Sequence, residues 1–229
     1  MELKGRRSKQ LLRKFLSAKN FRASIETICQ YPPRQSVNFL FPFFYDKEEI
    51  LRWRAITTFG RVVSILANKN MESARVIMRR LMWNLNDESG GIGWGSPEAM
   101  GEITALHPGL ATEFSTILRS YIRPDENFLE HGMLQRGVLW GIGRLAQERP
   151  DQLPETDTHL FPFLASEDRY HRGLAAWTMG NLKSRAAVKS LECLTEDKNK
   201  ILFFNDLQLK PVTVRDLAQK ALVNIWKTE

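Results

Sequence analysis

Apolar side chains recur three and four residues apart along most of the chain, which is the spacing of one face of an α-helix. Near the start, Leu11, Leu12, Phe15 and Leu16 form such a face, with basic residues between them. The pattern predicts consecutive pairs of helices joined by short connections. The predicted pairs are 8–17 with 21–31, 34–45 with 47–67, 71–87 with 96–106, 109–121 with 127–148, 155–165 with 167–182, and 185–195 with 212–227.

Prolines modify this plan at three places. Pro42 and Pro162 fall within or beside the first helices of their pairs, and we expect them to bend or shorten these helices because proline lacks the amide donor. Ser96 followed by Pro97 predicts a helix start, with the serine as N-cap and the proline at the first helical position.

Residues 196–211 are too long for an ordinary connection between helices. Within them, apolar residues flank Asn205-Asp206 on both sides. Two short apolar runs around such a pair predict a small β-hairpin at 201–209, inserted in the last helical pair.

The chain contains an internal repeat. Shifted by 120 residues, the segment 41–60 falls on 161–180 without a gap. The identical pairs are Phe41/Phe161, Pro42/Pro162, Phe43/Phe163, Arg52/Arg172, Ala55/Ala175, Thr58/Thr178 and Gly60/Gly180. The small residue that ends this pattern returns at intervals of 41, 42, 37 and 41 residues, as Gly60, Gly101, Gly143, Gly180 and Ala221. The period is therefore near 40 residues.

A period of about 40 residues with helical patterning is typical of stacked helix pairs. The string 172–182 resembles the second helix of HEAT-like repeats, especially the short form named after phycobiliprotein lyases, and 214–222 resembles it too. The resemblance covers roughly 34–227 and implies an all-α fold, a right-handed α–α superhelix of about six helical pairs. It further implies a single repeat domain over 1–229, in which 1–22 is a basic helical arm.

The second helices carry two distinct faces. With the recurring small residue as position zero, positions −4, −1, +2 and +3 form an apolar arc, which we expect to be buried. Positions −7, −3 and +1 form another arc, rich in tryptophan and charge, which we call the tryptophan stripe. Its candidate binding residues are Trp53, Arg61, Trp94, Glu98, Glu102, Arg136, Trp140, Arg144, Trp177 and Asn181.

Second helices line the concave side of such solenoids, and concave surfaces are what these proteins use for binding. Tryptophan and arginine are also the residues that dominate binding hot spots. The stripe therefore predicts a groove for a partner. The alternative is that each tryptophan packs on the neighbouring repeat, with its indole N–H donating to a carbonyl.

Arg52, Arg172 and Arg215 recur near the start of second helices and match the recurrent arginine of HEAT-like repeats. We expect a structural role for them, in which they donate to loop carbonyls or to the acid of a neighbouring repeat, Asp46 or Asp168.

The formal net charge of +7 is confined to the N-terminus. Residues 1–22 hold eight basic side chains and one acidic side chain, so of the 33 basic and 26 acidic residues in the chain, 25 of each remain for 23–229. A protein that grips a duplex along its length usually has a basic stripe on its body. The basic arm either docks on an anionic lipid, RNA or acidic partner, or is a first helix with its apolar face on the core.

Motifs that carry chemistry are sparse. The stretch 90–95 is rich in glycine, but no strand precedes it and no Lys-Ser/Thr pair follows it, so neither a P-loop nor a dinucleotide fingerprint is present. The acids around it would repel a phosphate; they could hold a cation or a lysine or arginine of a partner, or the stretch is a connecting loop. The surrounding stretch 83–95 resembles a segment of a small bacterial family of HEAT-like proteins.

The remaining reactive side chains form no recognisable set. The four histidines show no ligand spacing, and Cys29 and Cys193 are far apart, so we expect reduced thiols, no metal and no cofactor. No nucleophile, base and acid can be assembled from spacing. The longest uncharged apolar run, 37–45, is about half of the roughly 20 residues that a membrane helix needs.

These observations favour a cytosolic, non-enzymatic scaffold that binds a protein or peptide on its concave face. The alternative is a nucleic-acid protein resembling the HEAT-like alkylpurine DNA glycosylases, which hold a damaged base against concave tryptophans beside an aspartate and an arginine. The neutral body disfavours it, and so do the acids of the stripe, which are Glu98 and Glu102 rather than aspartate. Bilin attachment or isomerisation is a third possibility, supported by the type of repeat alone.

Overall fold

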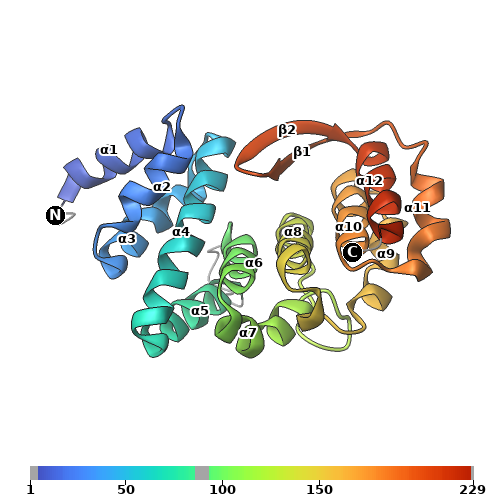
Figure 1. Ribbon diagram of the computed structural model, residues 1–229, viewed down its shortest axis with the longest axis horizontal. Helices are drawn as coiled ribbons and strands as arrows, with labels where there is room; N and C mark the ends of the chain where they lie inside the picture. Colours follow the sequence, from blue (N-terminus) through green and yellow to red (C-terminus); the bar gives the residue numbers. More distant parts are fainter. Residues whose placement is uncertain (1–4, 86–92, 228–229) are drawn as a thin grey trace. The chain divides into compact units, whose positions relative to one another are not determined.

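The computed structural model describes residues 5–85 and 93–227 (Figure 1). Each predicted helical pair is present. The elements are α1 (Gly5–Leu16), α2 (Phe21–Cys29), α3 (Pro33–Leu40), the 3₁₀ helix η1 (Phe41–Tyr45), α4 (Glu49–Lys69), α5 (Met71–Leu85), α6 (Ser96–Leu106), α7 (Pro108–Ser120), α8 (Gly132–Glu148), η2 (Pro150–Gln152), η3 (Thr156–His159), α9 (Phe161–Leu164), α10 (Arg169–Asn181), η4 (Arg185–Ala187), α11 (Val188–Leu194), β1 (Lys200–Asn205), β2 (Gln208–Thr213) and α12 (Val214–Trp226).

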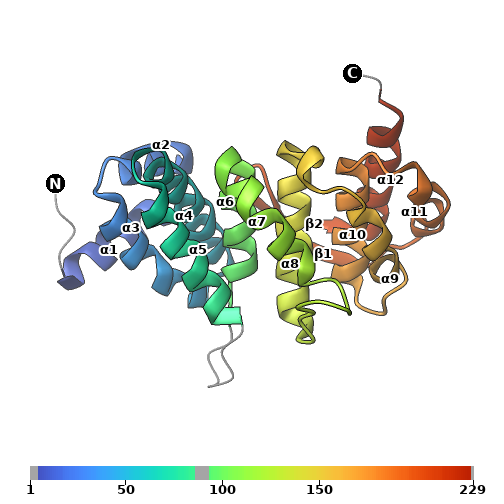
Figure 2. The same cartoon turned by 90° about the horizontal axis from the view of Figure 1, so that it is seen from below.

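These elements group into two compact units. The first unit contains Met1–Leu110 and Phe204–Leu209, and the second contains Ala111–Phe203 and Lys210–Glu229. In the first unit, α4 contacts α3, α5 and α6. In the second unit, α10 contacts both α8 and α12, and the three helices lie side by side in both views (Figures 1 and 2). The second helices of successive pairs are therefore neighbours within each unit, as expected for stacked repeats.

The apolar arc of the second helices is buried as predicted. Its members on α4, α6 and α8 are buried throughout. On α10, Ala176 and Met179 are buried, whereas Leu182 is half-buried and Lys183 is exposed. The difference arises because α10 ends at Asn181, so that the last two positions lie beyond the helix.

The two prolines shorten their helices as predicted. α3 gives way at Phe41 to the tighter 3₁₀ helix η1, whose second residue is Pro42. Pro162 is the second residue of α9, which is only four residues long.

The start of α6 differs from the prediction. Ser96 is the first helical residue rather than the N-cap, and its Oγ atom is buried with no hydrogen-bond partner among the described residues. The N-cap is Gly95, whose φ of 75° lies in the left-handed region that glycine tolerates. A Cβ atom at Gly95 would lie 2.9 Å from Cδ2 of Phe44, so the ring also excludes a larger residue here.

The predicted hairpin is present as the two-stranded sheet β1–β2. Its two-residue turn consists of Asp206 and Leu207, with φ angles of 47° and 59°. Positive φ at both central residues is the signature of a type I′ turn, whose twist matches that of paired strands.

The basic arm forms a helix that packs on the first unit. Leu12 and Leu16 of α1 are completely buried, and Arg13 forms ion pairs with Asp46 and Glu48. For the described residues, the arm is therefore a first helix with its apolar face on the core. No helix in the described ranges is long and apolar enough to cross a bilayer. Cys29 and Cys193 are free thiols, as expected.

Candidate functional site

The recurring glycine marks the point where consecutive second helices touch. In the first unit, a Cβ atom at Gly60 of α4 would lie 2.5 Å from Cγ of Glu102 on α6. In the second unit, a Cβ atom at Gly143 of α8 would lie 2.4 Å from Cζ3 of Trp177 on α10. Real Cβ atoms essentially never approach so closely, so glycine is what allows these helices to pack at this distance.

This contact places part of the tryptophan stripe against the next helix rather than in solvent. Trp140 is 3% exposed and Trp177 is 8% exposed. Their ring centroids are 6.3 Å apart, and Phe203 of β1 packs edge-on against Trp177 at 5.0 Å. The prediction that Trp140 and Trp177 line an open groove is therefore wrong, because both belong to the core of the second unit.

The polar members of the stripe in the second unit are engaged in internal bonds. Arg144 pairs with Glu148 one turn further along α8, at 2.7 Å. Asn181 donates through Nδ2 to the carbonyl oxygen of Gly143, at 3.1 Å. Arg144 thus bonds to the next turn of its own helix and Asn181 to the neighbouring helix. Both side chains have a structural role rather than a binding role.

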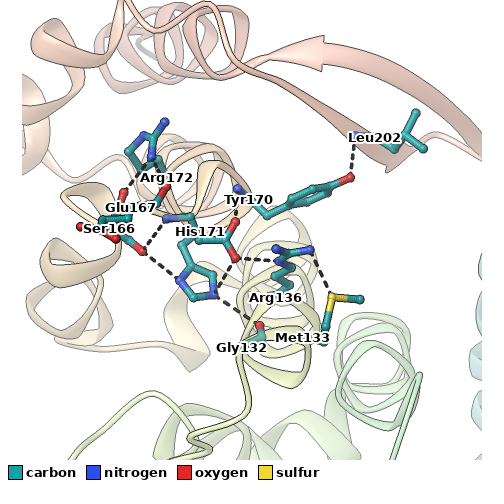
Figure 3. Close-up of polar contacts among 10 residues, drawn as sticks. Gly132, Met133, Arg136, Ser166, Glu167, Tyr170, His171, Arg172 and Leu202 are labelled. Carbon is teal, nitrogen blue, oxygen red and sulfur yellow. Dashed lines mark hydrogen bonds and ion pairs between the residues drawn. The ribbon is translucent and has the colours of Figure 1, made fainter.

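Arg136, the remaining member in this unit, belongs to a polar cluster at the start of α10 (Figure 3). Its Nε donates to Oδ2 of Asp168 at 2.8 Å, and its guanidinium lies over the Tyr170 ring, 4.4 Å from the centroid. Asp168 is the N-cap of α10 and accepts from the backbone N–H of Tyr170 at 2.8 Å. Burial favours a higher pKa for Asp168, but the bonds from Arg136 and from Tyr170 outweigh it and lower the pKa.

The same cluster contains the residue types of a hydrolase triad. The Oγ atom of Ser166 lies 3.1 Å from Nδ1 of His171, and Nε2 of His171 lies 3.7 Å from Oδ2 of Asp168. However, Oγ of Ser166 also accepts a hydrogen bond from the backbone N–H of Asp168. His171 is only 8% exposed and packs in an edge-to-face arrangement with the ring of Phe163. Burial is the main reason that the pKa of His171 is lowered. The cluster is a clasp that fixes the start of α10 to α8.

Two of the three recurrent arginines, Arg172 and Arg215, have the structural role predicted for them, but with acids other than Asp46 and Asp168. Arg172 donates to the carbonyl oxygens of Ser166 and Glu167, and its acid is Asp197 at 2.7 Å rather than Asp168. Arg215 donates to the carbonyl oxygen of Thr195 and pairs with Glu196.

In the first unit the recurrent arginine is Arg52. It lies 4.0 Å from Glu49 on its own helix. Asp46, its predicted partner, pairs with Arg13 instead.

The first-unit part of the stripe is less completely enclosed. Glu102 is 5% exposed beside Gly60, and Trp53 stacks on Phe204 of the hairpin. In contrast, Arg61 is exposed and Trp94, at the turn before α6, is half-buried.

Glu98, in the first turn of α6, is the unusual residue of this region. Its side chain is half-buried, but its Oε2 atom is buried and has no hydrogen-bond partner among the described residues. Burial raises the pKa of Glu98 to about 7, against the opposing effects of its own backbone N–H and of the charge on Arg52. Such a carboxyl group, in a stripe with tryptophans, is a candidate site because desolvated charged groups cluster at functional positions.

The described residues contain no group of three or more histidine, cysteine, aspartate or glutamate side chains that could hold a metal ion. The candidate site is centred on Glu98 and includes Trp94, which lies four residues earlier, before the start of α6. Arg61 belongs to the same stripe, but its charge acts on Cys29 of α2, whereas the charge that acts on Glu98 is that of Arg52. The sequence indicated Glu98, Trp94 and Arg61, but it did not separate them from Trp140 and Trp177, which are core residues.

No model of a protein family matches the chain. Over 116 residues the chain is 33% identical to an uncharacterised protein from Archaeoglobus fulgidus, and the alignment covers 50% of this chain and 56% of that protein. The chain thus spans about half the length of this curated relative. The relative is archaeal, and the resemblance to a bacterial family, whose segment 83–95 lies partly outside the described residues, stays a prediction.

Solved structures resemble the chain over almost its full length. An engineered protein has a TM-score of 0.53 at 14% identity, with 95% of this chain and 96% of that chain covered. A designed armadillo repeat protein in complex with the peptide (KR)4 has a TM-score of 0.52 at 14% identity, with 95% and 98% covered. At such identities the likeness concerns the fold alone. The chain has the armadillo/HEAT-like repeat fold, an α-solenoid architecture.

Proposed function

We propose that this protein is a non-enzymatic scaffold that binds a peptide or protein segment on the first-unit part of the tryptophan stripe, where Glu98 receives a lysine or arginine side chain. The observation that carries the proposal is the buried Oε2 atom of Glu98, which has no hydrogen-bond partner among the described residues. The two free cysteines fit a reducing compartment such as the cytosol.

The chemistry of Glu98 selects a cationic donor. A buried polar atom left without a partner costs about 1–3 kcal/mol, and more when it is charged. An ammonium or guanidinium group supplies N–H donors and a compensating charge, and its hydrogen bonds to a carboxylate are about twice as strong as neutral ones. A basic side chain bound at the half-buried Glu98 would supply the charge and the N–H donors that this carboxyl group lacks in the free protein.

The neighbouring stripe residues suit the same ligand. Trp94 precedes Glu98 by four residues, and an aromatic face attracts a cation through its quadrupole. The exposed Arg61 can donate to carbonyl oxygens or to an acid of the bound segment. A designed armadillo repeat protein of the same fold was solved with the basic peptide (KR)4, so this architecture is able to accommodate such a ligand.

The alternative, a base-binding protein like the HEAT-like glycosylases, has less support. It depended on accessible tryptophans, and Trp140 and Trp177 are buried.

The test measures the affinity of fluorescently labelled (KR)4 by anisotropy at pH 7.5 and fixed salt, with an acidic and a neutral peptide of the same length as comparisons. We expect (KR)4 to bind and Glu98→Gln to weaken it at least tenfold, because the amide keeps the shape but loses the charge. Glu192→Gln, an exposed acid on α11, serves as the control and should change the affinity less than twofold. Equal binding of all three peptides, or an equal effect of both variants, would contradict the role of Glu98.

A further inference from the structure

An aromatic ring from a distant part of the chain packs on Trp53 of the stripe. Phe204, at the end of β1, stacks on it with ring centroids 5.1 Å apart and ring planes 4° from parallel. Phe204 is 3% exposed, whereas Trp53 remains half-buried. The face of this indole therefore accepts a phenyl ring in a parallel arrangement, which is a favourable geometry for two aromatic side chains.

The hairpin turn that follows Phe204 has a disfavoured backbone conformation. Asp206 and Leu207 both have positive φ, and for a bulky residue such as leucine this is a true outlier, since the left-handed region suits glycine or asparagine. The ion pair between Asp206 and Arg22 spans 3.8 Å between largely exposed groups and contributes little. Such strain persists only where surrounding contacts impose it, and it concentrates at functional segments.

Trp53 lies close to the candidate site on Glu98. Trp53 precedes Gly60 by seven residues on α4, and Glu98 precedes Glu102 by four residues on α6. Because Gly60 and Glu102 touch, Trp53 and Glu98 differ in height by about one helical turn, or about 5 Å. Arg52, next to Trp53 in sequence, acts electrostatically on Glu98, which agrees with this placement.

We propose that the face of Trp53 is a binding subsite for an aromatic side chain of the bound peptide, and that Phe204 fills this subsite in the free protein. The inference rests on the proposed function, because the same peptide would place a basic side chain at Glu98. An extended chain advances about 3.3 Å per residue, so the aromatic and basic residues would lie within about three positions of each other. Phe204 is then a competitor that the partner's aromatic residue displaces.

The test uses the full chain and two labelled probes, (KR)4 and a peptide of the same length with one phenylalanine, Lys-Arg-Lys-Phe-Lys-Arg-Lys-Arg. Phe204→Ala removes the competitor and leaves Trp53. We expect this variant to bind the phenylalanine peptide at least tenfold more tightly than the unsubstituted protein does, while its affinity for (KR)4 changes less than threefold. Phe203→Ala is the matched control: it removes a phenylalanine of equal size from the same strand, one that packs on Trp177 instead, and it should shift both affinities alike.

A second variant tests the opposite direction. Leu207→Gly suits the positive φ at that position, so it should hold the hairpin turn more firmly and weaken binding of the phenylalanine peptide two- to threefold. Leu207→Gly is also the deciding variant if circular dichroism shows that Phe204→Ala does not fold. In that case, the proposal is overturned if Leu207→Gly binds the two peptides with the same ratio of affinities as the unsubstituted protein.

The outcomes separate the subsite from the proposed function. If (KR)4 binds but Phe204→Ala favours neither peptide, the aromatic subsite is disproved and the peptide-binding function stands. If no form of the protein binds either peptide, the peptide-binding function fails and the subsite fails with it.

Discussion

Trp177 occupies the space that a side chain at Gly143 would need. A Cβ atom at position 143 would lie 2.4 Å from Cζ3 of Trp177 and 2.6 Å from Oγ1 of Thr178. Because Gly143 of α8 has no side chain, the large side chain of Trp177 on α10 can pack directly against it. This relationship explains both why a small residue recurs every 40 residues and why this tryptophan is buried.

Adding one methyl group at this contact should destabilise the protein. We expect Gly143→Ala to lower the free energy of unfolding by about 1–3 kcal/mol, since overpacking a close-packed core forces side chains or helices apart. Gly132→Ala is the control, because a Cβ atom there would meet nothing within 4 Å. Urea denaturation of both variants measures the difference, and equal stabilities would show that the Gly143 contact is easily relaxed.

Removing the buried indole should be more costly still. We expect Trp177→Ala to destabilise the protein by about 3–5 kcal/mol, the range for emptying the space of a large aromatic side chain in a core. Trp83, which is 74% exposed on α5, supplies the comparison, and Trp83→Ala should cost less than about 0.5 kcal/mol. Thermal and urea unfolding report both values. A loss below 1 kcal/mol for Trp177→Ala would restore the possibility of an open groove around this residue.

The buried carboxyl group of Glu98 should make stability depend on pH. The folded protein raises the pKa of Glu98 from 4.5 to about 7, so the folded state holds this proton more tightly than the unfolded state does. Stability should consequently fall as the pH rises from 4.5 through 7 and level off above it. The total loss is at most about 3.5 kcal/mol, because each pKa unit corresponds to about 1.4 kcal/mol.

The comparison between the protein and Glu98→Gln isolates this effect from other titrating groups. We expect the variant to gain stability relative to the parent protein with increasing pH, when urea unfolding is measured at pH 5, 6, 7 and 8. Two curves that stay parallel over this range would mean that the carboxyl group ionises freely in the folded protein.

The clasp between α8 and α10 should show coupling between its two charged members. Asp168→Ala removes both the N-cap of α10 and the acceptor for Arg136, and should cost about 1–3 kcal/mol. The double-mutant cycle with Arg136→Ala should give a coupling energy of about 1 kcal/mol at pH 7, which disappears at acidic pH once the lowered pKa of Asp168 is passed. Additive effects of the two substitutions at pH 7 would show that the pair contributes no interaction energy.

The helical pairs, the hairpin and the apolar arc could be predicted from residue patterns because those patterns are local. A helix such as α4 shows its buried face through spacing alone, and the pair Asn205-Asp206 between two apolar runs indicates a hairpin without reference to the rest of the chain. The start of α6 could not be predicted so well. There the positive φ of Gly95 and the ring of Phe44 overrode the capping preference of Ser96.

The candidate site was only half predictable. The residue pattern assigned a stripe of tryptophans and charges to the second helices, including Arg61, Trp94 and Glu98, but Trp94 lies before the start of α6, and Trp140 and Trp177 are buried. The clasp residues Ser166, Asp168 and His171 carried no spacing that indicated their cluster, because Ser166 and Asp168 act through backbone N–H groups whose positions depend on the start of α10.

Local periodicity thus decided where helices and strands lie and which face of each helix is apolar. Only tertiary structure decided which polar and aromatic positions remain available to a partner. The physical reason is that a second helix in a solenoid contacts its own partner and also the second helices of neighbouring repeats, so the periodicity of one helix cannot show which stripe residues a neighbour covers. Trp177 against Gly143 is a contact of this kind, between residues 34 positions apart. Phe204 of β1 covers Trp53 of α4 from outside the helical pairs, across 151 positions, which the periodicity of α4 cannot show either.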